Sequence, residues 1–194
     1  TMWESLLVIF VCSYLAFSLS AICGGGAGLI LLPILGALLP LNLIPAALSI
    51  GTFTSSASRT LAFKKNIRWS IVKYFVPAAL PAVTLGAFFL KFINPIYLEI
   101  LMGIFLISNI PLVFKKPKEP EKAKLLSRFR LILIGLAAGF LSGLTGAVGL
   151  LFNKFYLQQG LTKVEIIATR AANEVTLHLI KIILYSLLGL ISVK

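Results

Sequence analysis

Four ionisable side chains recur at helical spacing in the apolar segment 164–191. Arg170, Glu174, His178 and Lys181 follow one another at intervals of four, four and three residues, so a helix would place them on one stripe. Ionisable groups at membrane depth are costly and usually face a protein interior or a water-filled cavity. Arg170 and Glu174 can form an ion pair, and His178 could titrate near neutral pH. We expect Glu174 and His178 to act in coupling or gating; the alternative is a locked structural pair, a hydrogen-bonded histidine and a Lys181 that extends to the membrane surface.

Two glycine-containing stretches offer a second kind of chemistry, the binding of an anion. SAICGGGAG at 20–28 and SGLTGAVG at 142–149 each interrupt an apolar run. A helix that restarts after such a break presents unpaired N–H groups and the positive end of its dipole, and glycine lets a ligand approach the backbone. The candidate binding residues are Ser20, Cys23, Gly24, Gly25, Gly26, Thr52, Ser56, Ser142, Thr145, Gly146, Thr169, Arg170 and Asn173. The alternative is that small residues only permit close helix packing.

The elements that must position these residues are membrane helices. Of the 194 residues 59% are hydrophobic, none is Asp, and the mean hydropathy is +1.01. About 20 helical residues are needed to cross the hydrocarbon core of a bilayer. Apolar runs of suitable length lie at 70–90 and 96–114, and softer ones at 5–22, 45–63, 131–144 and 164–191. The composition therefore predicts an all-α integral membrane protein, a polytopic helical bundle, with no cofactor and no metal site.

The positive charges indicate how the chain is oriented. Most of the net charge of +12 lies in the clusters KKNIR at 64–68 and KKPKEPEKAKLLSRFR at 115–130. Cytoplasmic loops of membrane proteins are enriched in Lys and Arg, so we expect the loops 64–69 and 115–130 in the cytoplasm and expect no nucleic-acid binding. Arg59, Lys73, Lys91 and Glu99 are expected to be interfacial anchors.

The chain contains a repeat of opposite orientation. SAICGGGAGLI at 20–30 aligns with SGLTGAVGLLF at 142–152, and each copy precedes a second apolar stretch, a turn and a long helix. The turn of the first copy, at 40–45, is uncharged and expected outside, whereas the turn of the second, at 158–163, carries a lysine and is expected inside. This reversal predicts two inverted repeats. Because 27–39 is too short to cross the membrane, each repeat should open with a glycine-broken re-entrant hairpin.

These features divide the chain into three expected segments. Residues 1–114 form the first inverted repeat, a hairpin plus three transmembrane helices, and residues 115–130 form a cytoplasmic basic linker. Residues 131–194 form a second inverted repeat that is incomplete. Three explanations stay open for the missing closing helices: a truncated sequence, a short variant of the fold, or a bundle completed by a second copy of the chain or by another subunit.

The duplicated pattern resembles the TauE/SafE sulfite exporter family of membrane permeases. SAICGGGAG with IGTFTSS is similar to the first glycine-rich segment of the family and the segment that follows it. SGLTGAVG with ATRAANEVTLHLIKIILY is similar to the second pair, although GAVGLLFNK replaces a stretch where the family carries more glycine and a proline. The resemblance implies a multi-pass permease of the cell (inner or plasma) membrane that moves sulfite, organosulfonates or related small sulfur-containing anions, usually outward, with proton coupling often proposed.

The leading functional prediction is therefore a secondary transporter and not an enzyme. It would export such an anion by alternating access around a midplane site formed by the two hairpin tips, with the lipid bilayer and protons as its other partners. An anion channel is the near alternative. A second alternative is an intramembrane serine hydrolase with Ser142 as nucleophile and His178 as base.

Overall fold

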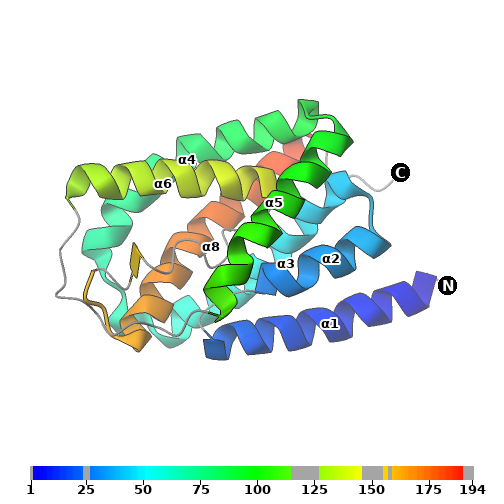
Figure 1. Ribbon diagram of the computed structural model, residues 1–194. Coiled ribbons are helices and arrows are strands. Elements are labelled where there is room, and N and C mark those ends of the chain that lie inside the picture. The colour runs from blue at the N-terminus through cyan, green and yellow to red at the C-terminus, as the bar shows by residue number, and fades with distance from the viewer. Residues whose placement is uncertain (1, 24–26, 115–126, 146–154, 157–158, 190–194) are drawn as a thin grey trace.

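The computed structural model describes residues 2–23, 27–114, 127–145, 155–156 and 159–189, and its regular elements in these ranges are helical (Figure 1). The seven α-helices of this part are α1 (Met2–Cys23), α2 (Ala27–Leu38), α3 (Ile44–Ala62), α4 (Trp69–Phe92), α5 (Pro95–Phe114), α6 (Arg128–Thr145) and α8 (Lys163–Leu187). Short 3-10 turns, η1 (Leu41–Leu43) and η2 (Lys64–Asn66), precede α3 and α4. The predicted all-helical bundle is confirmed in this part of the chain.

Local signals in the sequence mark where the helices begin. Pro95 starts α5, and the side-chain oxygen of Asn94 accepts a hydrogen bond from the backbone N–H of Ile96 at 3.0 Å. Before α8, the hydroxyl of Thr162 accepts from the N–H of Glu165 at 3.3 Å, and the Glu165 carboxylate accepts from the N–H of Thr162 at 2.9 Å. This reciprocal capping box satisfies N–H groups that the first helical turn cannot pair.

Two stretches in the described helices are long and apolar enough to cross a membrane by length and composition alone, Met2–Ala21 and Trp69–Phe92. Helix α8 is 25 residues long but carries charged side chains along one face. In α1 the described side chains of Ala16 and Ser20 are buried, whereas the large apolar residues Trp3, Phe10 and Tyr14 are exposed. A surface of this kind suits contact with lipid.

Helix α8 lies in the middle of the bundle (Figure 1). Helices α4 and α6 pack against each other and cover one side of α8. Helix α3 packs along α8, and α2 packs against both α3 and the outer helix α1. Contacts between Arg68 and Thr169 and between Ser56 and Glu174 show that α3 and the turn after it run antiparallel to α8. This crossing of α3 and α8 brings together side chains that are more than 100 residues apart.

Helices α4 and α6 run parallel in very close contact along a row of glycines. A Cβ atom added to Gly135 would lie 2.7 Å from the carbonyl oxygen of Phe75, and one added to Gly143 would lie 2.7 Å from that of Val83. Only glycine permits such an approach between two helix backbones, as in other small-xxx-small packings. The close contact fixes α6 beside α4 and so positions Ser142, which precedes Gly143.

Candidate functional site

The charged stripe predicted on α8 faces the interior of the bundle. Arg170, Glu174, His178 and Lys181 are all buried, and the side chain of Lys181 is fully enclosed. With a rise of 1.5 Å per residue, Glu174 lies about 17 Å along a helix that is about 37 Å long. The stripe therefore occupies the central part of α8.

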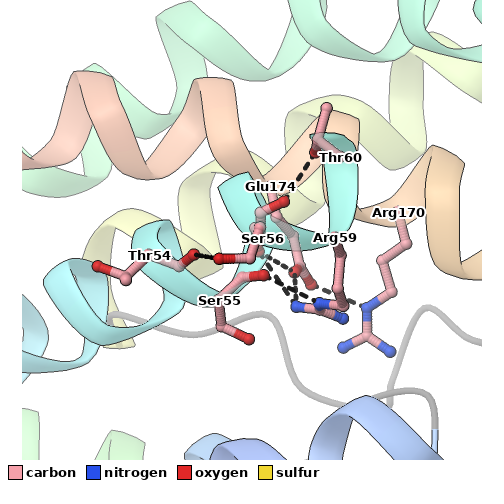
Figure 2. A network of polar contacts seen from close by, with 8 residues as sticks. Thr54, Ser55, Ser56, Arg59, Thr60, Arg170 and Glu174 are labelled. Atoms are coloured by element: carbon pink, nitrogen blue, oxygen red, sulfur yellow. Dashed lines mark hydrogen bonds and ion pairs between the residues drawn. The ribbon is translucent and has the colours of Figure 1, made fainter. Parts of the chain in front are cut away.

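The carboxylate of Glu174 is held by donors from two helices (Figure 2). On α8, Nε of Arg170 donates to Oε1 of Glu174 at 2.8 Å. On α3, the hydroxyl of Ser56 donates to Oε2 at 2.9 Å, and Nη2 of Arg59 donates to the same oxygen at 3.4 Å. The predicted ion pair between Arg170 and Glu174 is present, and it is part of a larger cluster of four residues.

The position of Arg59 corrects an expectation from the sequence. Arg59 was expected to anchor the chain at the membrane interface, but only 9% of its surface is exposed. The cause is the crossing of α3 with α8, which turns the face carrying Ser56 and Arg59 toward Glu174. The Nη1 atom of Arg59 is buried and has no hydrogen-bond partner among the described residues. Arg59 is thus a member of the polar cluster.

The described residues of the cluster carry more positive than negative charge. Arg59 and Arg170 face one carboxylate, that of Glu174. Guanidinium groups present a planar fork of donors that matches carboxylates and other oxyanions. An excess cationic charge in a water-poor interior attracts an anion strongly, because little solvent screens it. The arrangement is therefore suited to binding a small oxyanion.

Lys181 forms a second polar contact further along the same stripe. Its Nζ atom donates to the hydroxyl of Ser142 at 2.6 Å and to the Ser142 carbonyl oxygen at 3.2 Å. Lys181 therefore does not extend to the membrane surface. The Nδ1 atom of His178 is buried and has no hydrogen-bond partner in the described part of the chain. The described bonds of Ser142 run to Lys181 and not to His178, which is not the serine–histidine pairing that a hydrolase would need.

Two further candidates on α8 bond to other elements. The side-chain N–H of Asn173 donates to the Tyr156 hydroxyl at 2.9 Å, while its Oδ1 atom is buried without a partner among the described residues. The hydroxyl of Thr169 accepts from the backbone N–H of Arg68 at 3.0 Å, so it fastens the turn before α4 to α8. Tyr156 was not predicted from the sequence, because nothing in its neighbourhood indicates a buried partner on α8.

The candidate binding residues at the two hairpins and in α3 are described only in part. Ser20 is buried near the end of α1, and Thr52 is half-buried in α3. Cys23 and Thr145 are the last helical residues of α1 and α6, and their side chains lie outside the described part of the chain. Gly24, Gly25, Gly26 and Gly146 also lie outside it. The expected meeting of the two hairpin tips therefore falls outside the described residues.

The chain was compared with known families and proteins. It matches the family model described as Sulfite exporter TauE/SafE over residues 9–194, which includes every residue of the polar cluster. No curated protein and no solved structure matches it. Members of the matched family are membrane transporters and not enzymes. The resemblance inferred from the two glycine-containing stretches is thus confirmed, and the chain belongs to the TauE/SafE sulfite exporter family.

Proposed function

We propose that this protein exports sulfite, an organosulfonate or a related small sulfur-containing anion across the cell membrane by alternating access. The observation that carries the proposal is the buried cluster in which Arg59 and Arg170 share the single carboxylate of Glu174. A transporter for anions needs a cationic site at membrane depth. Clusters of ionisable side chains at that depth are energetically costly, and where they occur they usually serve a function. Membership of the family supplies the class of anion.

The proposed architecture is a pair of inverted repeats, 1–114 and 131–194, joined by the linker 115–130. Each repeat begins with a re-entrant hairpin whose tip is broken by glycine. The 12-residue helix α2 supports this design, because it spans only about 18 Å at 1.5 Å per residue. Helices α3 and α8, which occupy equivalent places in the two repeats, run antiparallel, as an in-plane pseudo-two-fold axis requires.

The proposed orientation places the loops 64–69 and 115–130 in the cytoplasm. One contact supports it: Arg68 of the first loop pairs with Glu165 in the first turn of α8 at 2.7 Å. The start of α8 and the loop 64–69 therefore lie on the same side of the protein. Lys163 begins α8, so the positive charges at both places fall on one side, as the distribution of Lys and Arg in membrane proteins favours.

The proposed substrate path runs past the cluster toward the two hairpin tips. Ser56, Arg170 and Asn173 line its central part together with Arg59, which the structure adds to the set. The remaining sequence candidates are proposed to bind the anion as it passes the tips or the helices that follow them: Ser20, Cys23, Gly24, Gly25, Gly26, Thr52, Ser142, Thr145, Gly146 and Thr169. Glu174 and His178 are proposed to couple or gate the movement.

The test is transport by the purified protein in proteoliposomes. Sulfite in oxygen-free buffer, sulfate, thiosulfate, chloride and a small alkanesulfonate are compared, with and without an imposed pH gradient. We expect saturable transport of a sulfur oxyanion in preference to chloride, and accelerated exchange when the same anion is present on the far side. Transport without such exchange would indicate the channel instead, and no transport of any anion would contradict the proposal.

A further inference from the structure

We propose that the Glu174 carboxylate occupies the binding site of the transported anion. Protonation of Glu174 frees this site for the substrate. The inference rests on the anion transport proposed above and specifies how that site is coupled to protons. The substrate takes over the donors that now hold the carboxylate, so one proton travels with one singly charged anion in the same direction.

The geometry around Glu174 is that of an oxyanion site that is already filled. Its two oxygens accept from Arg170 at 2.8 Å, from Ser56 at 2.9 Å and from Arg59 at 3.4 Å. A sulfonate or sulfite presents oxygen acceptors at a similar spacing and binds the same kind of donors. As Figure 2 shows, these donors converge on the carboxylate from α3 and α8. A substrate that reaches the crossing of the two helices therefore competes with Glu174 for the same groups.

The α3 side of the site has a hydrogen-bond donor that the described residues do not use. The contact from Arg59 is the longest of the three, and the Nη1 atom of Arg59 is buried without a hydrogen-bond partner among the described residues. Leaving a charged donor buried and unpaired is costly, which favours the arrival of a further acceptor. An incoming anion can first meet Arg59 Nη1 and then replace the carboxylate on Ser56.

Glu174 is the acid placed to receive the proton. Of the other described acids, Glu4 and Glu99 are exposed, and Glu165 pairs with Arg68 at the start of α8. The titratable and charged groups around Glu174 come from several elements: Arg59 from α3, Tyr156 from the segment before α8, and Arg170, His178 and Lys181 from α8 itself. On α6, Ser142 contacts this stripe by accepting a hydrogen bond from Lys181. Just before α4, the charged group is Arg68, which donates to the carboxylate of Glu165.

Charge balance connects the proton to the anion. Arg59, Arg170 and the Glu174 carboxylate together carry a charge of about +1, and protonating the carboxylate raises this to about +2. A singly charged anion then restores the starting value. A second anion beside an ionised Glu174 would place like charges in contact, and a proton without an anion would remove the negative charge that faces Arg59 and Arg170. Movement of the anion alone and movement of the proton alone are thus both disfavoured, which is the requirement for coupled transport.

The test uses a small alkanesulfonate as the probe, because it keeps one negative charge over the pH range of the assay whereas sulfite itself titrates. Binding of the radiolabelled sulfonate to the purified protein is measured as a function of pH. We expect the wild type to bind more tightly as the pH falls. Glu174→Gln, which mimics the protonated acid, should bind at least about tenfold more tightly at neutral pH and lose the pH dependence, tenfold corresponding to one pKa unit. Glu165→Gln, a matched change on the same helix that keeps a residue suited to a capping box, should behave as the wild type.

A second measurement on the wild type keeps the inference testable if Glu174→Gln does not fold. Proteoliposomes loaded with a pH-sensitive dye receive an outward sulfonate gradient, and the internal pH is followed. We expect the interior to become alkaline as sulfonate leaves, with about one proton per anion. Sulfonate efflux without proton movement, or unchanged pH dependence in Glu174→Gln, would overturn the displacement of Glu174 and leave anion transport intact. A wild type that neither binds nor transports any sulfur oxyanion would overturn both.

Discussion

Lys181 of α8 donates a hydrogen bond to the hydroxyl of Ser142 in α6 across 2.6 Å, with both residues fully buried. The hydroxyl of Tyr185, one turn further along α8, donates to the carbonyl oxygen of Gly143. The start of the second glycine-containing stretch, at the end of α6, is thus tied to α8.

Removing the acceptor of Lys181 should destabilise the protein. In Ser142→Ala the buried ammonium group loses one hydrogen bond, and leaving a buried polar group less satisfied costs about 1–3 kcal/mol. Thermal unfolding in detergent should show the loss as a lower midpoint. Ser58→Ala is the matched control, because the Ser58 hydroxyl is exposed and bonds only to the Thr54 carbonyl oxygen of its own helix. Equal midpoints for the two variants would contradict the importance of the Lys181 contact.

The close contact between α4 and α6 should not tolerate a side chain. A Cβ atom on Gly143 would lie 2.7 Å from the carbonyl oxygen of Val83 and 2.8 Å from the backbone nitrogen of Ala87, neither of which can move without shifting α4. Gly143→Ala is therefore expected to cost about 1–3 kcal/mol. Gly103→Ala in α5 meets nothing within 4 Å and should leave stability unchanged or raise it by up to about 1 kcal/mol. A Gly143→Ala protein as stable as Gly103→Ala would show that the helices are further apart than described.

The capping box at the start of α8 makes a smaller contribution. Thr162→Ala removes the side-chain acceptor for the N–H of Glu165 and should cost about 1 kcal/mol. Amide hydrogen exchange of the first turn of α8 should accelerate in this variant. In Thr54→Ala, which alters an exposed hydroxyl bonded to Ile50 within α3, the exchange of α8 should stay as in the wild type. Unchanged exchange in Thr162→Ala would mean that Arg68 and Glu165 hold the turn without the cap.

The helices were largely predictable from the sequence because their signal is local. The apolar run 70–90 became α4 and the run 96–114 became α5, with the break at Asn94 and Pro95 as expected. The stripe from Arg170 to Lys181 was also predictable, since helical periodicity alone places its members on one face. Its burial followed from the cost of leaving such groups in lipid.

The contacts between helices were not predictable in the same way. Arg59 precedes the basic stretch 64–68, so its charge was assigned to the membrane interface, whereas its partner Glu174 is 115 residues away. A usable signal was present: Thr52, Ser56 and Arg59 are spaced four and three apart, which makes one polar face on α3. The spacing of Gly135, Gly139 and Gly143 likewise indicated a packing face, but not that α4 would fill it.

Binding of the anion where α3 crosses α8 is tested most directly by comparing Arg59, which contacts Glu174, with Arg68, which pairs with Glu165 at the start of α8. Sulfonate transport into proteoliposomes is measured for the wild type, Arg59→Gln, Arg59→Lys and Arg68→Gln. Arg59→Gln leaves the ion pair between Arg170 and Glu174 in place, so the variant should fold. We expect its transport to fall at least about tenfold, since a charge-assisted hydrogen bond is lost, with Arg59→Lys intermediate and Arg68→Gln close to the wild type. Wild-type transport by Arg59→Gln, or equal losses in Arg59→Gln and Arg68→Gln, would contradict the claim.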